Sequence, residues 1–180
     1  MMKRLTNILI GALVILLAVG ATTQTRPDFS GRWTSEPSSA GDGQRNVSGE
    51  RIGDMGSGWG PNITITQTAE RMTVEYLFFA RGDMQPPLRF IFALGGSETR
   101  NSVMMGRGIQ EQTSKTAWES DKLVITTKHS FAGAEIGQPL TSEVKQTLAL
   151  ESPTSLIIET TRSGVLGGPS STTRTVYRKL

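Results

Sequence analysis

The stretch Leu88-Arg89-Phe90-Ile91-Phe92-Ala93-Leu94 places a large apolar residue at every second position. Successive side chains of a β-strand point to opposite faces, so this spacing predicts a strand with one strongly apolar face. Residues 72–79 repeat the pattern. Strands of this kind form sheets with one buried side and one solvated side. The shared apolar faces consist of Leu88, Phe90, Phe92 and Leu94 in the first stretch and Met72, Val74, Tyr76 and Phe78 in the second.

The same alternation extends outward along the chain in both directions. Gly, Pro, Asn and Asp interrupt it at short intervals, and no segment after the N-terminal leader has a convincing helical period. Strands so close in sequence usually pair as antiparallel hairpins. The further predicted strands are residues 31–35, 63–67, 98–104, 115–118, 123–131, 142–150, 156–162 and 172–179.

A meander of this many strands has to bury one face and protect two edges, and closure into a barrel does both. The predicted fold is therefore all-β: a single antiparallel up-and-down barrel of about 8–10 strands, filled by side chains or holding one small ligand. It covers residues 29–180 and follows an N-terminal signal helix. A two-sheet sandwich is the second choice. An outer-membrane barrel is disfavoured because paired aromatic girdles are missing.

Residues 1–21 are interpreted as a signal peptide. Lys3 and Arg4 precede an uncharged apolar run, residues 8–19, that is short for a membrane-spanning helix. Small residues lead up to Ala21, so we expect cleavage there, and an uncleaved anchor is the alternative. Residues 22–28 would then form an extended N-terminal segment. The mature protein would be secreted or periplasmic and not integral to the membrane, and the short leader and absent cysteines favour a bacterium.

Charge and cysteine content exclude several classes of protein. The chain carries 19 Lys and Arg against 16 Asp and Glu, a net charge of +3. Loss of Lys3 and Arg4 with the leader would leave 17 against 16, and no basic run remains to bind nucleic acid. The sequence contains no cysteine, so the protein has neither a disulfide nor a lipid-modified N-terminal cysteine.

The two ends of the predicted barrel carry a resemblance. Gly31-Arg32-Trp33 is similar to the G-x-W signature that opens the first strand of lipocalins and of the wider calycin group, which includes the fatty-acid-binding proteins. The resemblance implies a lipocalin-like barrel whose end is closed by Trp33, packed against an arginine of the last strand, here Arg174 or Arg178. The chain also resembles small secreted bacterial proteins of unassigned function.

Two features depart from the fatty-acid-binding pattern. Those proteins hold a carboxylate with an Arg and a Tyr two residues apart on the last strand, whereas Arg174 and Tyr177 are three apart and must face opposite sides. They also place a helical lid between the first two strands, whereas residues 38–60 contain seven glycines here. We expect a long Gly-rich loop there, with Trp59 either folded over the barrel mouth or on the surface.

Aromatic residues on the apolar strand faces are the candidates for ligand binding. In a barrel the core and a pocket share the inner face, so these side chains either pack together or line a cavity. Met72, Ile125 and Leu148 would lie on the same face. The predicted ligand-binding residues are Trp59, Tyr76, Phe78, Phe90, Phe92 and Trp118.

The sequence predicts no catalytic residue, metal ligand or cofactor. His129 is the only histidine, and neither a nucleophile nor further metal ligands can be placed beside it. We interpret it as a surface or rim residue. Residues 53–60 are rich in glycine but lack the Lys-Ser/Thr ending of a phosphate-binding loop.

These observations favour a secreted or periplasmic binding protein that holds a small apolar or amphipathic ligand in its barrel. The alternative is a protein-interaction module or inhibitor of the cell envelope, with a packed barrel and functional loops at residues 38–60 and 95–108. An enzyme ranks third because no nucleophile and base can be paired.

Overall fold

The computed structural model describes residues 26–36, 57–76, 87–105, 108–131, 140–163 and 169–180. The expected signal peptide and residues 38–56 of the Gly-rich loop lie outside the described residues. Ten strands occupy the described part: β1 (Gly31–Ser35), β2 (Asn62–Gln67), β3 (Arg71–Tyr76), β4 (Leu88–Ala93), β5 (Thr99–Met105), β6 (Gly108–Glu119), β7 (Lys122–Phe131), β8 (Leu140–Ser152), β9 (Ser155–Arg162) and β10 (Ser171–Lys179).

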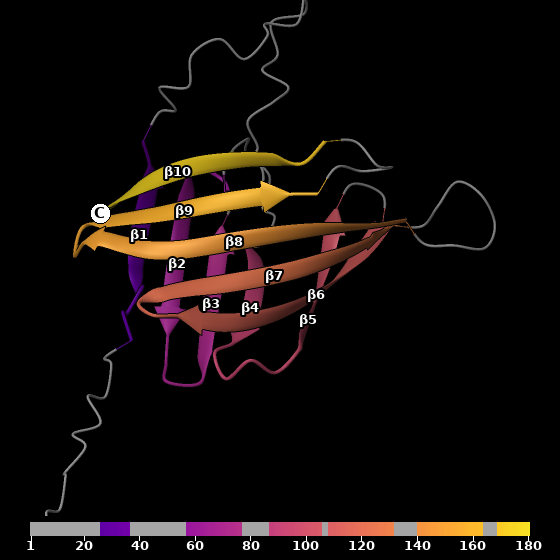
Figure 1. Cartoon of the computed structure of the whole chain (residues 1–180), viewed down its shortest axis with the longest axis horizontal. Coiled ribbons are helices and arrows are strands. Elements are labelled where there is room, and N and C mark those ends of the chain that lie inside the picture. Colours follow the sequence, from indigo (N-terminus) through magenta and orange to yellow (C-terminus); the bar gives the residue numbers. More distant parts are fainter. Residues whose placement is uncertain (1–25, 37–56, 77–86, 106–107, 132–139, 164–168) are drawn as a thin grey trace, which may run out of the picture.

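All ten strands belong to one antiparallel sheet in the order β4-β3-β2-β1-β10-β9-β8-β7-β6-β5. Pairing of β1 with β10, with Trp33 opposite Lys179, joins the first strand to the last. The sheet therefore curls into a nearly closed barrel, in which β1–β4 lie behind β6–β9 and cross them in Figure 1. The predicted fold class, a single antiparallel all-β barrel, is confirmed.

Strand β6 is the main difference between the predicted and observed strands. Only residues 115–118 were expected to form a strand there, whereas β6 runs from Gly108 to Glu119. Its inward-facing residues Gln112, Ser114 and Thr116 are buried but polar. The apolar alternation that reveals the other strands is therefore absent from β6.

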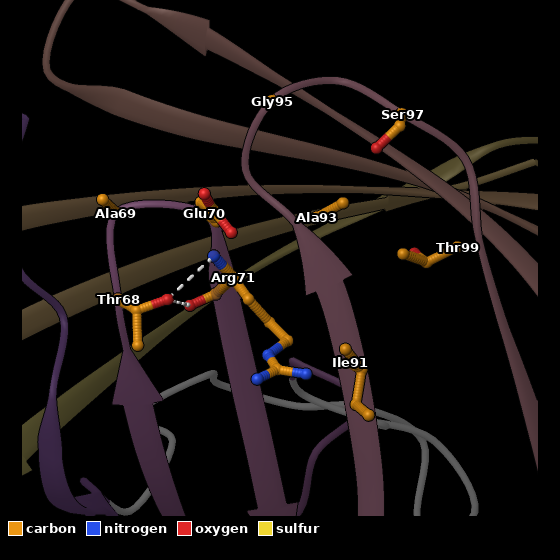
Figure 2. A pocket seen from close by; sticks show the side chains of 9 residues that line it. All are labelled: Thr68, Ala69, Glu70, Arg71, Ile91, Ala93, Gly95, Ser97 and Thr99. Atoms are coloured by element: carbon orange, nitrogen blue, oxygen red, sulfur yellow. Dashed lines mark hydrogen bonds between the residues drawn. The ribbon is translucent and has the colours of Figure 1, made fainter.

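The seam between β4 and β5, the two edges of the sheet, is bridged by side chains. The Asn101 amide on β5 accepts the Ile91 N–H through Oδ1 (2.8 Å) and donates to the Ile91 carbonyl through Nδ2 (3.0 Å). Thr116 donates its hydroxyl to the Ala93 carbonyl at 2.5 Å. Figure 2 shows the turn that carries the chain from Ala93 to Thr99, from one edge toward the other. These side chains replace part of the missing ladder of backbone hydrogen bonds.

Replacing Asn101 by alanine should lower the free energy of unfolding by about 1–3 kcal/mol, because the Ile91 N–H and carbonyl would lose their partner. Urea denaturation followed by circular dichroism measures the change. Ser102→Ala is the control, since Ser102 is exposed and should change stability by less than about 0.5 kcal/mol. Equal losses in the two variants would contradict a structural role for the Asn101 amide.

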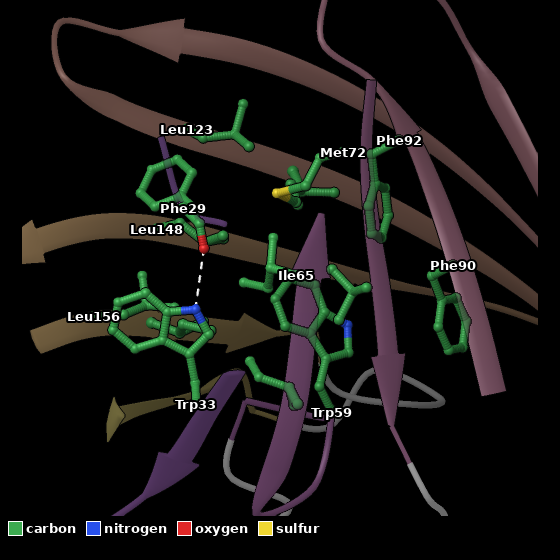
Figure 3. Close-up of a cluster of buried hydrophobic side chains, with 14 of the residues drawn as sticks. Phe29, Trp33, Trp59, Ile65, Met72, Phe90, Phe92, Leu123, Leu148 and Leu156 are labelled. Carbon is green, nitrogen blue, oxygen red and sulfur yellow. Dashed lines mark hydrogen bonds between the residues drawn. The ribbon is translucent and has the colours of Figure 1, made fainter. Parts of the chain in front are cut away.

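The core lies on the inner face of the barrel, where the alternating strands direct their apolar side chains. Figure 3 shows side chains of β2, β3 and β4 meeting those of β7, β8 and β9 across the interior. The buried hydrophobic cluster comprises Phe29, Trp33, Trp59, Ile63, Ile65, Met72, Val74, Tyr76, Phe90, Phe92, Leu94, Leu123, Ile125, Leu148, Leu156, Ile158 and Tyr177. A cluster drawn from strands on both sides of the barrel and from the N-terminal segment holds the sheet in its curled form.

One end of the barrel, which we call the turn end, carries the turns of three hairpins, β2–β3, β6–β7 and β8–β9, and the connection from β4 to β5. Residues 26–30 cross this end, and Phe29 is fully buried there. Gln67 holds them in place. Its Oε1 accepts the Phe29 N–H (3.1 Å), its Nε2 donates to the Pro27 carbonyl (2.8 Å), and its backbone N–H donates to Ser30 Oγ (3.0 Å). The N-terminal segment thus covers the turn end.

Trp33 is buried beside this segment, and its indole N–H donates to the Phe29 carbonyl at 3.0 Å (Figure 3). The Nζ of Lys179 lies 5.4 Å from the centroid of the Trp33 ring. Gly31 leaves room for that lysine, because a Cβ at Gly31 would lie 2.7 Å from Lys179 Cε. The φ of Gly31 is also +150°, which a residue with a side chain rarely adopts.

Lys179 therefore takes the place that the resemblance gave to Arg174 or Arg178, and this corrects the expectation. Both arginines are exposed: Arg174 Nη2 lies 3.8 Å from Glu151 Oε1, and Arg178 Nε lies 2.5 Å from Glu36 Oε1. Residues 174 and 178 face the opposite side of β10 from residues 177 and 179, because side chains alternate along a strand.

Candidate functional site

Four of the predicted ligand-binding residues meet inside the barrel. Tyr76 and Phe90 stack with their ring centroids 5.6 Å apart, and the Trp59 ring lies 6.0 Å from that of Phe92. We call these four residues the aromatic cluster; three of them are labelled in Figure 3. All four are buried. Phe78, the fifth aromatic residue predicted for this wall, lies outside the described residues.

Trp118, the remaining predicted ligand-binding residue, lies at the turn end instead. Its ring stacks on that of Phe29 with centroids 6.1 Å apart, and the Arg26 guanidinium carbon lies 5.2 Å from the Trp118 ring centroid. The indole N–H is buried and has no hydrogen-bond partner within the described part of the chain. Trp118 therefore belongs with the N-terminal segment and not with the aromatic cluster.

The inner face of β6–β9, which lies opposite β1–β4 (Figure 1), carries buried polar side chains as well as the apolar side chains of the core. We call its buried polar residues the polar arc: Gln112, Ser114, Thr116, Thr127, Gln146 and Thr160. Ser114 and Thr127 share a hydrogen bond of 2.9 Å between their hydroxyl groups. Removing hydroxyl and amide groups from water costs free energy unless they find partners. The polar arc is thus a set of directed hydrogen-bonding groups inside an otherwise apolar barrel.

The polar arc was not predicted, because only apolar strand faces were taken to point inward. The available signal was positional: in the predicted strand at residues 123–131, Thr127 has the same parity as Ile125, and Gln146 has the same parity as Leu148 in the strand at 142–150. Once those two apolar residues are placed inside, Thr127 and Gln146 must also face the interior. The corresponding signal on β6 was lost with the strand itself.

The short segment Ser57–Gly60, which we call the interior turn, enters the barrel between the two walls. The Ser57 carbonyl accepts hydrogen bonds from Gln146 Nε2 at 2.6 Å and from Thr160 Oγ1 at 3.5 Å. Ser57 is 1% exposed and Trp59 4%. Trp59 was expected over the barrel mouth or on the surface, whereas it lies inside the core.

Tyr177 of β10 holds the other side of the interior turn. Its hydroxyl donates to the Gly60 carbonyl at 2.6 Å, which uses its only hydrogen. The Ser57 hydroxyl, 2.6 Å from the Tyr177 oxygen, therefore donates to it. Ser57 Oγ in turn accepts the Trp59 N–H at 3.2 Å. These hydrogen bonds tie β10 to the interior turn, and Ser57 precedes Tyr177 by 120 residues in the sequence.

Among the described residues, the buried ionisable groups are Tyr76 and Tyr177, and His129 and Arg162 are half-buried. Burial raises the pKa of Tyr76 to about 12, and the nearby Tyr177 adds to the rise. Burial also raises the pKa of Tyr177 to about 12, against the opposing effect of its hydrogen bond with Ser57. Burial lowers the pKa of His129, and the positive charge of Arg162 acts in the same direction.

Arg162 supplies a permanent positive charge next to the interior turn. A guanidinium stays protonated at all ordinary pH values. Its Nη1 lies 3.4 Å from the Thr173 hydroxyl, and its Nη2 would be 3.5 Å from a Cβ at Gly58. The guanidinium of Arg162 therefore lies close to Gly58 of the interior turn.

A hollow of about 540 Å³ lies on the outside of the barrel, over β3, β4 and the seam. Its lining residues are Thr68, Ala69, Glu70, Arg71, Ile91, Ala93, Gly95, Ser97 and Thr99. The Arg71 side chain extends along β3 toward Ile91 in Figure 2. Most of the lining residues are exposed, and none of them is a buried polar group. The interior, where buried polar groups converge, is therefore the stronger candidate site.

The described ranges contain neither a cluster of metal ligands nor a membrane-spanning helix. No group of three or more His, Asp or Glu side chains there is placed to hold a metal ion. Within the same ranges, no helix has the length and apolar character needed to cross a bilayer.

Fold and interior together define the class of protein: a nearly closed antiparallel barrel of ten strands, whose apolar core includes an aromatic cluster and an arc of buried polar residues. No known family model matches the chain, and no curated protein matches it in sequence.

Proposed function

We propose that the protein binds a small amphipathic molecule inside its barrel. The observation that carries the proposal is the division of the interior between the aromatic cluster and the polar arc. Binding sites for small molecules combine an apolar lining with a few directed polar groups that fix orientation. Both kinds of group lie on the inner face of the barrel here, so one ligand with an apolar body and a polar group would find partners for both.

The charge of the interior restricts the polar group of such a ligand. Tyr76 and Tyr177 are neutral at physiological pH, since their pKa values lie near 12. The polar arc offers hydroxyl and amide groups, which are also uncharged. We therefore favour a neutral oxygen-bearing group.

We also propose that the barrel is of the lipocalin-like calycin type and acts in the periplasm or outside the cell. The closure of β1 on β10, with Trp33 under a cation of the last strand, supports the first proposal. The basic and apolar leader of residues 1–21 supports the second.

Native mass spectrometry on the protein purified from a bacterial periplasm tests the binding proposal. We expect a discrete extra mass that disappears on denaturation. Gln146→Leu should reduce the retained ligand by about tenfold, because the loss of one directed hydrogen bond inside a binding site costs about 1–2 kcal/mol. Lys145→Gln is the matched control: Lys145 is the neighbouring residue on β8, is exposed on the outer face, and should leave retention unchanged.

The second candidate function is the protein-interaction module with a packed barrel. It is favoured by one specific observation, the burial of Trp59 inside the barrel, where the interior turn fills space that a ligand would need. A bare protein mass in the same experiment, together with capture of a defined periplasmic protein, would contradict ligand binding and support this alternative.

A further inference from the structure

The interior turn is held in place by the contacts that a ligand would use. Its Ser57 carbonyl accepts hydrogen bonds from Gln146 and Thr160 of the polar arc. Its Trp59 ring lies 6.0 Å from Phe92 and is 4% exposed. In chemical terms, a planar aromatic ring and a carbonyl oxygen already occupy the space between the two walls.

The attachment of the interior turn differs from that of the barrel strands. Ser57–Gly60 belongs to no strand and pairs with no backbone ladder. Gly58 and Gly60 have φ values of +85° and +76°, which glycine adopts without the cost that other residues would incur. Displacing the interior turn would break a few hydrogen bonds and expose one large side chain, that of Trp59. Displacing a strand would instead break the sheet. Segments of this kind open locally at a lower free energy than the whole domain unfolds.

We propose that the interior turn and a ligand occupy the barrel in alternation, and that the ligand copies the turn: a planar aromatic ring beside Phe92, with an oxygen acceptor at Gln146 and Thr160. This inference rests on the proposed binding function and adds the class of ligand and the step that admits it. When the turn leaves, the Gln146 amide, the Thr160 hydroxyl and the Tyr177 hydroxyl lose their partners at once. A ligand oxygen in the place of the Ser57 carbonyl would again accept hydrogen bonds from Gln146 and Thr160.

Labelling of a single thiol tests whether the interior turn opens by itself. Because the chain has no cysteine, Ser57→Cys introduces the only thiol. The control is Ser155→Cys, since Ser155 is also 1% exposed and lies on β9 with its hydroxyl on Glu151. We expect a thiol reagent to label the Ser57 variant at least about tenfold faster than the Ser155 variant in the native protein. Equal rates would overturn the proposal, because the turn would then move only when the barrel unfolds.

Hydrogen exchange in the unmodified protein removes any effect of the substitution itself. The Trp59 amide, which donates to Ser57 Oγ, should exchange at least about tenfold faster than the Ile158 amide in β9. Equal protection of the two amides would overturn the proposal even if the cysteine variant opened, since the variant would have created the opening.

The ligand class is tested with two probes, 2-naphthol and naphthalene, which differ by one hydroxyl group. We expect 2-naphthol to accelerate labelling of the Ser57→Cys variant several-fold and naphthalene to have a smaller effect. Adding Gln146→Leu should remove the difference between the probes. No acceleration by 2-naphthol, or slower labelling, would overturn the alternation. Retention of a natural ligand by a protein whose interior turn stays protected would overturn this inference and leave the proposed binding function intact.

Discussion

Replacing Trp33 by alanine should lower the free energy of unfolding by about 3–5 kcal/mol, the range typical of removing a fully buried large aromatic side chain. Trp33 is 1% exposed, and its indole N–H donates to the Phe29 carbonyl across the turn end. Its loss would leave a cavity beneath residues 26–30 and deprive that carbonyl of its partner. Chemical denaturation at neutral pH gives the value, provided that the slope of the transition stays unchanged.

Two variants separate the contributions of burial from those of the contacts around the ring. Trp33→Phe keeps an aromatic ring but removes the N–H, so it should be less costly than alanine. Lys179→Met keeps most of the chain that passes over the ring and removes the charge, with an expected loss of about 0.5–1 kcal/mol. A loss below about 1 kcal/mol in Trp33→Ala would contradict the burial of Trp33 at the barrel end.

The fold could be predicted because strand alternation and turn residues are local signals. In β3 and β4 the residues Met72, Val74, Phe90 and Phe92 are all buried, as the period of two requires. The closing of β1 on β10 followed from the need to protect sheet edges. The length of β6 was underestimated because its inner residues are polar. A buried face without hydrophobic residues leaves no apolar alternation in the sequence.

The candidate site could be predicted only in part. Tyr76, Phe90 and Phe92 were placed correctly on one inner wall, since each lies in a strand with a clear apolar face. Trp59 lies in a Gly-rich segment without any period, so its entry into the core depends on contacts with residues as distant as Tyr177. Long-range contacts of that kind leave no local pattern in the sequence.

The cation beside Trp33 can be identified from the local geometry of the last strand. Arg174 and Arg178 were suggested by residue type, because the resemblance implied an arginine. Parity along the last strand places Tyr177 and Lys179 on one face and both arginines on the other. Register with β1 then brings Lys179 directly opposite Trp33. Strand geometry was the better guide in this position.

Raising the pH from 10 to 12 should destabilise the protein by about 3–5 kcal/mol through its two tyrosines alone, since a tenfold change in an ionisation constant corresponds to about 1.4 kcal/mol. In the unfolded chain both tyrosines lose their proton near pH 10. In the folded protein burial holds both pKa values at about 12. Between these values the unfolded state binds fewer protons than the folded state, so stability falls as the pH rises. Well below pH 10 neither state ionises and this contribution to the pH dependence vanishes.

The measurement is direct because the sequence contains only two tyrosines. Tyrosinate absorbance in the folded protein should appear only as the pH approaches 12, and urea denaturation at several pH values should give the loss of stability. Tyr76→Phe is the cleaner variant, since the described structure gives its ring a stacking partner in Phe90 but gives its hydroxyl no hydrogen bond. It should remove about half of the alkaline loss. Either tyrosine titrating near pH 10 in the native protein would contradict its burial.

Tyr177 should behave differently from Tyr76, because its ionisation acts on the interior turn. A protonated Tyr177 donates to the Gly60 carbonyl, and a tyrosinate has no hydrogen to donate. The phenolate oxygen would then face the carbonyl oxygen at a distance that suits only a hydrogen bond, so ionisation should expel the turn before the barrel unfolds. Labelling of Ser57→Cys should therefore accelerate with pH more steeply than the growing thiolate fraction of the exposed thiol explains. In Tyr76→Phe the acceleration should persist, whereas in Tyr177→Phe it should disappear and the turn should open more readily at every pH. Acceleration that persists in Tyr177→Phe would separate the opening of the turn from the ionisation of this tyrosine.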